Sequence, residues 1–220
     1  MAELKIGFVT FNPGSGDGDQ AVTVSGEKYE GRVQRTQQVN FGAESGGVKK
    51  VATINQAAVA EFVKIDPTAS VRKGGGTVTI NGTSNSTKLT FSLTPNETHP
   101  LTLEIPASYQ AAGKATNNGA VIANDPGATG SFTFSIVFSG IAANTEVNDL
   151  VNTLKVTAAG GQTANTVITQ TAGDPFLEID IDKEVINLNA NGTPQTINVN
   201  ANIRWTITQA VSKLVRKVMK

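Results

Sequence analysis

Short segments of this chain alternate apolar and polar residues, and Gly, Pro, Asn and Asp gather between the segments. A period of two is typical of β-strands with one buried face, and these four residues are typical of turns. Abundant Thr, Val and Ile also favour strands. The pattern therefore predicts an all-β protein. Strands are expected over residues 5–11, 21–24, 33–41, 48–54, 62–65, 77–81, 89–93, 101–105, 131–138, 150–156, 166–169, 176–181, 185–188, 196–199 and 203–208.

Three segments depart from this alternation. Lys73 and the three glycines at 74–76 precede an alternating segment, which predicts a hairpin turn. A short turn of helix is expected near residues 107–112. From Val211 to Met219 the apolar spacing fits a short C-terminal helix, although it also fits the extension of a strand.

The chain resembles itself at an offset of 114 residues. Residues 46–79 then align with residues 160–193, and ten of the 34 pairs are identical. A repeat of this length indicates a duplicated module, and repeated modules usually supply reach or multiple contacts rather than one catalytic centre. Identical pairs include Ile54 with Ile168, Gln56 with Gln170, Phe62 with Phe176 and Ile65 with Ile179.

The repeat also straddles a junction, because each copy reads as the last strand of one unit, a short link and the first strand of the next. Residues 61–173 are therefore expected to form a complete β-sandwich. Residues 1–60 form a short β module that holds chiefly closing strands, and residues 174–220 form a partial module with opening strands and a basic tail. We expect tandem modules whose short links prevent free tumbling.

Composition narrows the classes of partner. The formal net charge is zero, so long-range attraction to nucleic acid is not expected. The absence of cysteine excludes disulfides and thiolate metal sites and fits synthesis in a reducing cytoplasm. No secretory signal and no apolar segment of membrane-spanning length is visible. No cofactor and no membrane contact are expected.

No combination of residues predicts catalysis. The single histidine, His99, precedes Pro100, which restricts it to an extended loop. No nucleophile or paired acid can be assigned to it. The glycine run after Lys73 lacks the Gly-Lys-Ser/Thr of a phosphate-binding loop and precedes a strand rather than a helix. We expect that the protein is not an enzyme.

Four carboxylates, those of Glu178, Asp180, Asp182 and Glu184, share one parity. On a continuous strand they would project from the same face. This acidic stripe is expected to be solvated or to face a partner. Calcium is the alternative ligand, because it prefers carboxylate oxygens, although the full twelve-residue calcium loop is absent.

The C-terminal tail carries Lys213, Arg216, Lys217 and Lys220 and no acidic residue. Such a tail is expected either to dock on an acidic neighbour or to remain a solvated end. Together with the acidic stripe, these four cations are the candidate partner contacts.

A set of residues spread over most of the chain forms a further pattern. They are Gln56, Phe62, Ile65, Pro67, Val71, Gly74, Gly75, Gly76, Asn85, Gln170 and Asn202 to Trp205. Together they resemble the BACON-type immunoglobulin-like modules, which are common in gut Bacteroidetes and in their crAss-like phages. The resemblance implies immunoglobulin-like β-sandwiches and places Trp205 in a core. Secreted members usually carry a signal and an enzyme neighbour, so this chain is more similar to a phage virion protein.

The expected function is structural. The chain is expected to be an auxiliary or decoration protein on the capsid surface of a tailed bacteriophage. Its partners would be the major capsid protein, other virion subunits or another copy of this chain, bound through multivalent β-sandwich contacts. The alternative is a carbohydrate- or mucin-binding module, for which Trp205, Tyr29 or Tyr109 would stack on a sugar ring.

Overall fold

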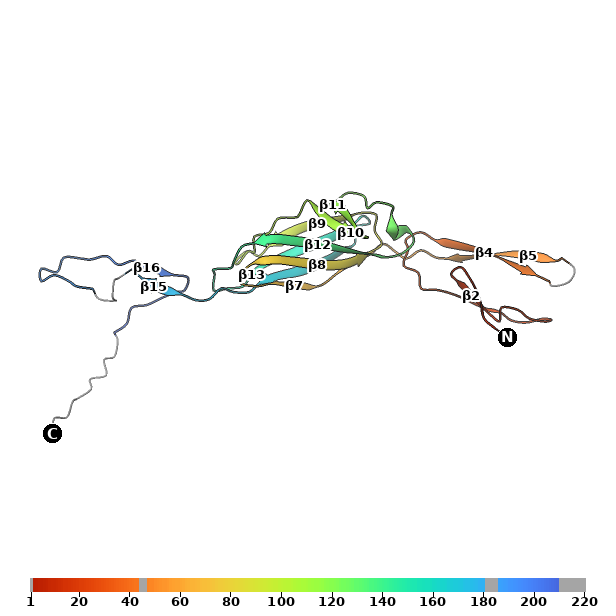
Figure 1. Ribbon diagram of the computed structural model, residues 1–220, viewed down its shortest axis with the longest axis horizontal. Helices are drawn as coiled ribbons and strands as arrows, with labels where there is room; N and C mark the ends of the chain where they lie inside the picture. Colours follow the sequence, from red (N-terminus) through yellow and green to blue (C-terminus); the bar gives the residue numbers. More distant parts are fainter. Residues whose placement is uncertain (1, 44–46, 181–185, 210–220) are drawn as a thin grey trace, which may run out of the picture.

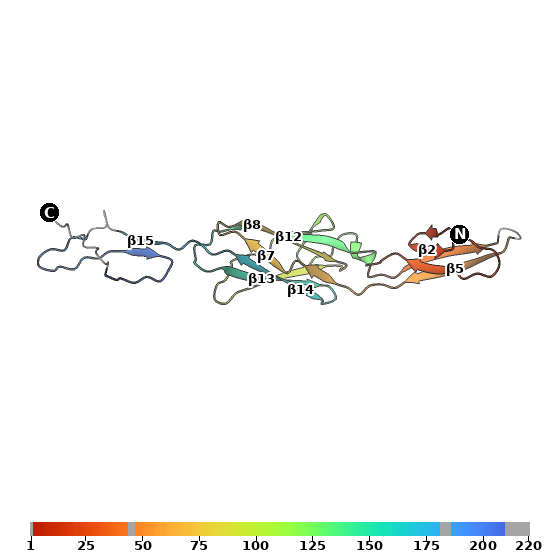
Figure 2. The same ribbon diagram turned by 90° about the horizontal axis from the view of Figure 1, so that it is seen from below.

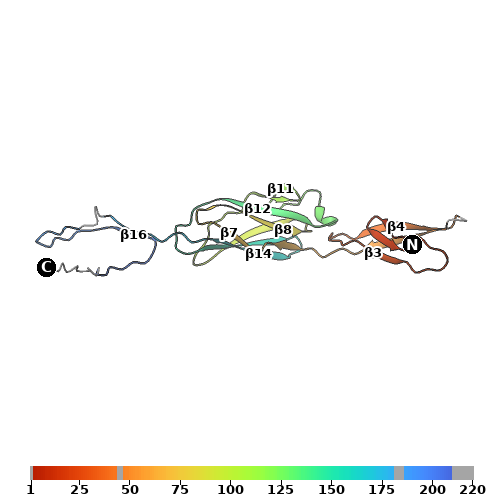
Figure 3. The ribbon, with the colours of Figure 1, turned by 60° about the horizontal axis from the view of Figure 1, so that its bottom comes forward.

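The computed structural model describes residues 2–43, 47–180 and 186–209, and nearly all of its regular structure is β. Three units follow one another along the long axis of the molecule (Figure 1). Views from two other directions show the same order, with the N-terminal unit at one end, a sandwich in the middle and a two-stranded unit at the other end (Figures 2 and 3). The all-β sandwich prediction is confirmed.

The N-terminal unit packs a three-stranded sheet, in the order β1-β2-β3, against a hairpin formed by β4 and β5. Val9, Phe11 and Val39 form its small core. The single strand predicted over residues 5–11 is wrong, because Gly7 adopts a positive φ of 60° and the chain turns there. The strands are β1 (Leu4–Ile6), β2 (Val9–Asn12), β3 (Thr23–Gly26), β4 (Arg35–Gly42) and β5 (Lys49–Gln56).

The central unit is a sandwich of two sheets. A five-stranded sheet has the order β11-β10-β12-β8-β6, and a four-stranded sheet has the order β7-β14-β13-β9. All strand pairs are antiparallel except β14 with β7, which is parallel. The strands are β6 (Val63–Ile65), β7 (Thr68–Val71), β8 (Gly76–Ser84), β9 (Leu89–Pro95), β10 (Ser108–Ala111), β11 (Lys114–Asn117), β12 (Phe132–Ile141), β13 (Leu150–Ala158) and β14 (Thr163–Gln170).

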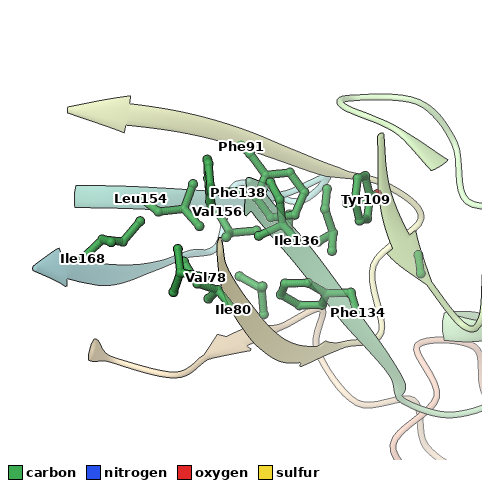
Figure 4. Packing of buried hydrophobic residues seen from close by; sticks show 14 of the residues in the cluster. Val78, Ile80, Phe91, Tyr109, Phe134, Ile136, Phe138, Leu154, Val156 and Ile168 are labelled. Carbon is green, nitrogen blue, oxygen red and sulfur yellow. The ribbon is translucent and has the colours of Figure 1, made fainter. Parts of the chain in front are cut away.

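The main core lies between these two sheets (Figure 4). Alternate residues of β12 point inward, including Phe134, Ile136 and Phe138, and they meet Leu154 and Val156 of β13. All fully buried members of this cluster lie between residues 63 and 168. The predicted unit 61–173 therefore contains both layers of its own sandwich.

Three local predictions in the central unit are wrong. Lys73 and its glycines connect β7 in one sheet to β8 in the other, so they form a turn between layers and not a hairpin. Gly75 has φ +74°, and a Cβ there would lie 2.0 Å from the carbonyl oxygen of Ile141. The segment 107–112 contains strand β10 rather than a helical turn, and residues 101–105 form no strand although Leu101 is buried.

The C-terminal unit contains one antiparallel pair in its described residues, β15 (Leu177–Ile179) with β16 (Val199–Ala201). The strand predicted over residues 203–208 is not formed. Trp205 is 43% exposed, so its expected core position is wrong. The reason is structural: no second sheet covers this pair in the described part of the chain. The predicted helix at 211–219 lies outside the described residues.

The structure reproduces the internal repeat strand by strand. Strand β14 has the bounds of β5 shifted by 114 residues, and β15 has the bounds of β6 shifted by the same amount. Phe62 and Phe176 each stand one residue before their strand. The β15–β16 ladder also matches the β6–β8 ladder, since Val63 opposite Ser84 corresponds to Leu177 opposite Ala201. The C-terminal unit is therefore built as the opening pair of a sandwich.

Candidate partner-binding surface

Large exposed hydrophobic side chains are concentrated in the two outer units. In the central unit the described residues of this kind are Val121, Val137 and Val167. The middle of the molecule has a closed core, whereas both ends leave apolar surface in contact with water. Exposed apolar side chains that gather in one part of a molecule often mark a site of protein interaction. The exposed residues at the ends are Leu4, Val22, Val24, Val33, Phe41, Val48, Val51, Val59, Phe176, Leu177, Ile179, Ile186, Leu188, Ile203, Trp205 and Ile207.

Because of the repeat, the exposure of each residue in the C-terminal pair can be compared with that of its equivalent in the central unit. Val63 on β6 is 8% exposed because the facing sheet covers it, whereas the equivalent Leu177 on β15 is 53% exposed. Ile179 is likewise 44% exposed, while its equivalent Ile65 packs against the central core. These residues have the spacing of an inner sheet face, but the described chain supplies no second layer. We call Leu177, Ile179, Val199 and Ala201 the open face.

An asparagine fixes the C-terminal unit to the central sandwich. The side-chain oxygen of Asn202 accepts the Phe176 N–H at 2.9 Å, and its Nδ2 donates to the carbonyl of Asp174 at 3.0 Å. Nδ2 also donates to the carbonyl of Thr145 in the central unit at 2.7 Å. Lys73 adds an exposed ion pair with Asp174 at 2.6 Å. The open face is therefore held at a defined position beyond the sandwich.

The same clamp holds the first junction. The Asn85 oxygen accepts the Phe62 N–H at 2.8 Å, and its Nδ2 donates to the carbonyls of Ala60 at 3.3 Å and Glu30 at 3.1 Å. Asn85 is fully buried. At both junctions, therefore, an Asn directly follows the end of a strand, and its side chain forms hydrogen bonds with the link and with the preceding unit.

Further contacts join the first junction to the loop before β12, which contains the short 3-10 helix Pro126–Ala128. The N–H of Arg32 donates to the carbonyl of Gly127 at 3.0 Å, and the Arg32 guanidinium pairs with Asp125. The Tyr29 hydroxyl donates to the Ala128 carbonyl at 3.1 Å. This junction has several independent ties and cannot act as a free hinge.

The acidic stripe is only partly described. Glu178 lies on β15 and is exposed. Asp180 is engaged within the chain: its carboxylate accepts the Asn198 N–H at 2.5 Å and also the Asn198 side-chain amide. These hydrogen bonds hold the pKa of Asp180 below its ordinary value. Asp180 therefore ties the two strands together, which leaves Glu178 as the described free carboxylate of the stripe.

The other six predicted contacts lie outside the described residues. They are Asp182 and Glu184 of the stripe and Lys213, Arg216, Lys217 and Lys220 of the tail. Within the described residues, no group of three or more His, Cys, Asp or Glu side chains is arranged to hold a metal ion.

The N-terminal unit carries a hollow of about 490 Å³ with a mixed polar and apolar lining. Leu4, Phe11, Val39 and Phe41 line it, together with the loop around Pro13. Phe11 and Phe41 meet edge to face, with ring centroids 5.9 Å apart, yet Phe41 remains 48% exposed. The sequence carries no sign of this hollow, because its lining residues are spread from Leu4 to Val48 and only folding brings them together.

A second hollow, of about 600 Å³, lies on the outer face of the five-stranded sheet. Hydroxyl and amide side chains line it, including those of Asn81, Thr83, Gln110 and Ser135, although more of its exposed lining is apolar than polar. The one aromatic residue among its lining residues, Phe134, is 2% exposed and belongs to the core. This surface can form hydrogen bonds with a polyhydroxyl ligand but offers it no exposed ring for stacking.

The two tyrosines proposed for sugar stacking are unsuited to it. Tyr29 and Tyr109 are both buried, at 9% and 3% exposure. Burial raises the pKa of the Tyr109 hydroxyl, and its ring packs against Phe91 with centroids 4.7 Å apart. Trp205 is the proposed sugar-binding aromatic that lies at the surface.

His99 follows β9 in a turn where its backbone N–H donates to the side-chain oxygen of Asn96 at 2.9 Å. Its ring makes no hydrogen bond with another described residue. In the described residues there is no helix long and apolar enough to cross a membrane.

Comparison of the sequence with protein-family models finds no match, and comparison with curated proteins finds no significantly similar sequence. Function must therefore be argued from the residues and their arrangement.

Proposed function

We propose that this chain is a non-enzymatic structural protein of a tailed-phage virion, an auxiliary or decoration protein that docks on the capsid surface through its outer units. The observation that carries the proposal is the uncovered apolar surface at both ends of a string whose middle is closed. Burying such surface in a partner stabilises a complex, whereas leaving it in water costs free energy.

The junctions support multivalent docking. Both links are crossed by a clamping asparagine, so the two outer surfaces are held apart by the central sandwich rather than by a flexible tether. When one end has bound, the other is presented near a neighbouring subunit, which raises its effective concentration. A regular lattice of subunits is the kind of partner that benefits most from such fixed spacing.

The order of strands in the central unit supports the immunoglobulin-like part of the resemblance. Taking β6 as the first strand, the four strands β10-β12-β8-β6 follow the D-E-B-A order of an immunoglobulin constant domain. The facing strands β14-β13-β9 follow the G-F-C order of its other sheet. Such domains serve many functions, so the strand order supports a fold and not a partner.

A carbohydrate- or mucin-binding role is the second candidate, and the observation that favours it is the set of hydroxyl and amide groups in the hollow on the five-stranded sheet. Asn81, Gln110 and the neighbouring hydroxyl groups could bind sugar hydroxyls there. The hollow lacks an exposed aromatic ring, which is the feature that usually gives sugar sites their affinity.

Two measurements separate these functions. Virions of the encoding phage should contain the chain, and antibodies against it should label their outer surface in electron micrographs. Purified chain should bind no glycan selectively on an array. Absence from the virions, together with selective glycan binding that Gln110→Ala abolishes while the fold is retained, would replace the first function by the second.

A further inference from the structure

The intact central unit shows which strand position is unoccupied among the described residues of the C-terminal unit. In the central sheet β6 is the edge strand, whereas β8 has partners on both sides, β6 and β12. The equivalent of β6 is β15, so β15 would be an edge strand even in a complete sheet. The equivalent of β8 is β16, and no described strand occupies its second side. The abnormal free edge is therefore that of β16.

The ladder shows which backbone groups face this free edge. The Asp180 N–H donates to the Asn198 carbonyl at 3.1 Å, as the Asp66 N–H does to the Asn81 carbonyl. Hydrogen-bonded pairs alternate with non-bonded pairs along an antiparallel ladder. The N–H and C=O groups of Val199 and Ala201 therefore point away from β15. Their equivalents, Gly82 and Ser84, pair with Phe134 and Phe132 of β12.

We propose that the free edge of β16 binds an antiparallel β-strand from another protein, in the position that β12 occupies in the central unit. Strand β12 gives the pattern for that strand, because Phe132, Phe134, Ile136 and Phe138 lie at alternate positions and are all buried. One position must differ. Phe134 pairs with Gly82, where an added Cβ would lie 2.3 Å from the Phe134 ring, and the equivalent of Gly82 in β16 is Val199. A docking strand with a small residue opposite Val199 and large apolar residues at the other alternate positions would cover the open face.

The length of β16 is consistent with a missing partner. Strand β8 extends from Gly76 to Ser84 and pairs with β12 along most of its length, whereas β16 contains three residues. The apolar side chains that follow it, Ile203, Trp205 and Ile207, are 37%, 43% and 84% exposed. They too have the alternation of a strand and no covering layer in the described residues.

Charge sets the second requirement for the partner. Lys64 on the outer face of β6 is replaced by Glu178 on β15. The described residues of this unit include Asp174, Glu178 and Asp180 and one cation, Arg204. A docking strand with Lys or Arg at its outward positions is therefore favoured. A second copy of this chain is not the expected occupant, because its own β12 is already built into the central sheet.

This inference rests on the proposed docking function but is tested without a virion. The probe is a synthetic peptide of residues 131–140 that carries T133K, F134A and S135K, added to the full-length protein; alanine at 134 makes room for Val199. We expect saturable binding, and slowed hydrogen exchange at the amides of Val199 and Ala201. A peptide of the same composition with its apolar and polar positions interchanged should bind at least about tenfold more weakly, which corresponds to about 1.4 kcal/mol. A peptide with T133E, F134A and S135E should also bind more weakly.

The matched variants are Val199→Pro, which removes an edge donor, and Val199→Ala, which keeps it. Proline should abolish peptide binding and alanine should retain most of it. Three results would overturn the inference. They are equal binding of the probe peptide and the peptide with interchanged positions, slowed hydrogen exchange at β15 instead of β16, and dimerisation of the chain through this edge. If virions incorporate Val199→Pro as well as the wild type, docking uses another surface, and the proposed function survives while strand addition does not.

Discussion

At the scale of single residues, two asparagines do the same structural work at two junctions. Asn85 and Asn202 each follow a strand end, accept the N–H of a phenylalanine and donate to carbonyls of the link and of the preceding unit. An amide side chain is suited to this role because it presents both an acceptor and two donors. The contacts convert short links into fixed joints.

Replacing Asn85 with alanine should destabilise the protein by about 1–3 kcal/mol, because the Phe62 N–H would be left buried without an acceptor. Urea unfolding measures this change. Asn118→Ala is the matched control, since Asn118 bonds both backbone groups of Phe91 inside the central unit. The control should destabilise the protein without altering the contact between the first two units. An unchanged free energy of unfolding in Asn85→Ala would contradict the proposed role of this side chain at the junction.

Asp180 makes the β15–β16 pair sensitive to acid. Its pKa is lowered in the folded chain by the Asn198 N–H and side-chain amide. The stabilisation is therefore present above the ordinary Asp pKa of about 3.9 and is lost as pH falls through the lowered value. NMR titration should show the Asn198 signals shifting with an apparent pKa below that of a free aspartate. Asp180→Asn should remove this transition, and an ordinary pKa would contradict the tie.

At the scale of elements, the same ladder occurs in two environments. The β6–β8 pair is covered by a second sheet, and the β15–β16 pair has the same register without one. Isolated two-stranded pairs are marginally stable in water, so the hydrogen bonds made by Asp180 and Asn202 are important to the C-terminal pair. Burial, rather than register, is what differs between the copies.

Equivalent substitutions should therefore have unequal effects. Val63→Ala should cost about 1–3 kcal/mol, because buried methyl groups are lost and a cavity remains. Leu177→Ala should change the stability of the free protein by less than about 0.5 kcal/mol, because Leu177 is largely exposed. Chemical unfolding of the two variants measures both values. A large cost at Leu177 would show that the open face is already covered.

Sequence reasoning worked where alternation and the repeat agreed. The offset of 114 residues correctly predicts that β14 is the equivalent of β5 and that β15 is the equivalent of β6. It failed where tertiary context decides: Gly7 reverses the chain within one alternating segment, and Leu101 is buried without belonging to a strand. The core expected around Trp205 is not formed by the described residues of its unit. The unoccupied edge of β16 depends on how the strands pair in three dimensions, which alternation along the sequence does not specify.

At the scale of the whole molecule, three units in line form an extended string with a closed middle and open ends (Figure 1). A compact domain of this length would have a radius of gyration of about 17 Å. Small-angle X-ray scattering should give a clearly larger value and a rigid, elongated particle. The double variant Arg32→Ala, Asn85→Ala should broaden the distance distribution, whereas Asn118→Ala should not. Scattering of the wild type as freely jointed beads would contradict the fixed junctions.

The central claim is that the open face docks the chain on a virion. The most direct test is co-sedimentation of purified full-length chain with phage particles that lack it, comparing wild type with the double variant Leu177→Asp, Ile179→Asp. Thermal unfolding should first show that the central sandwich of the variant is intact. The account predicts saturable binding of the wild type and at least about tenfold weaker binding of the variant, since charges on a face that must be buried oppose docking. Equal binding of the two proteins, or no binding of the wild type, would contradict it.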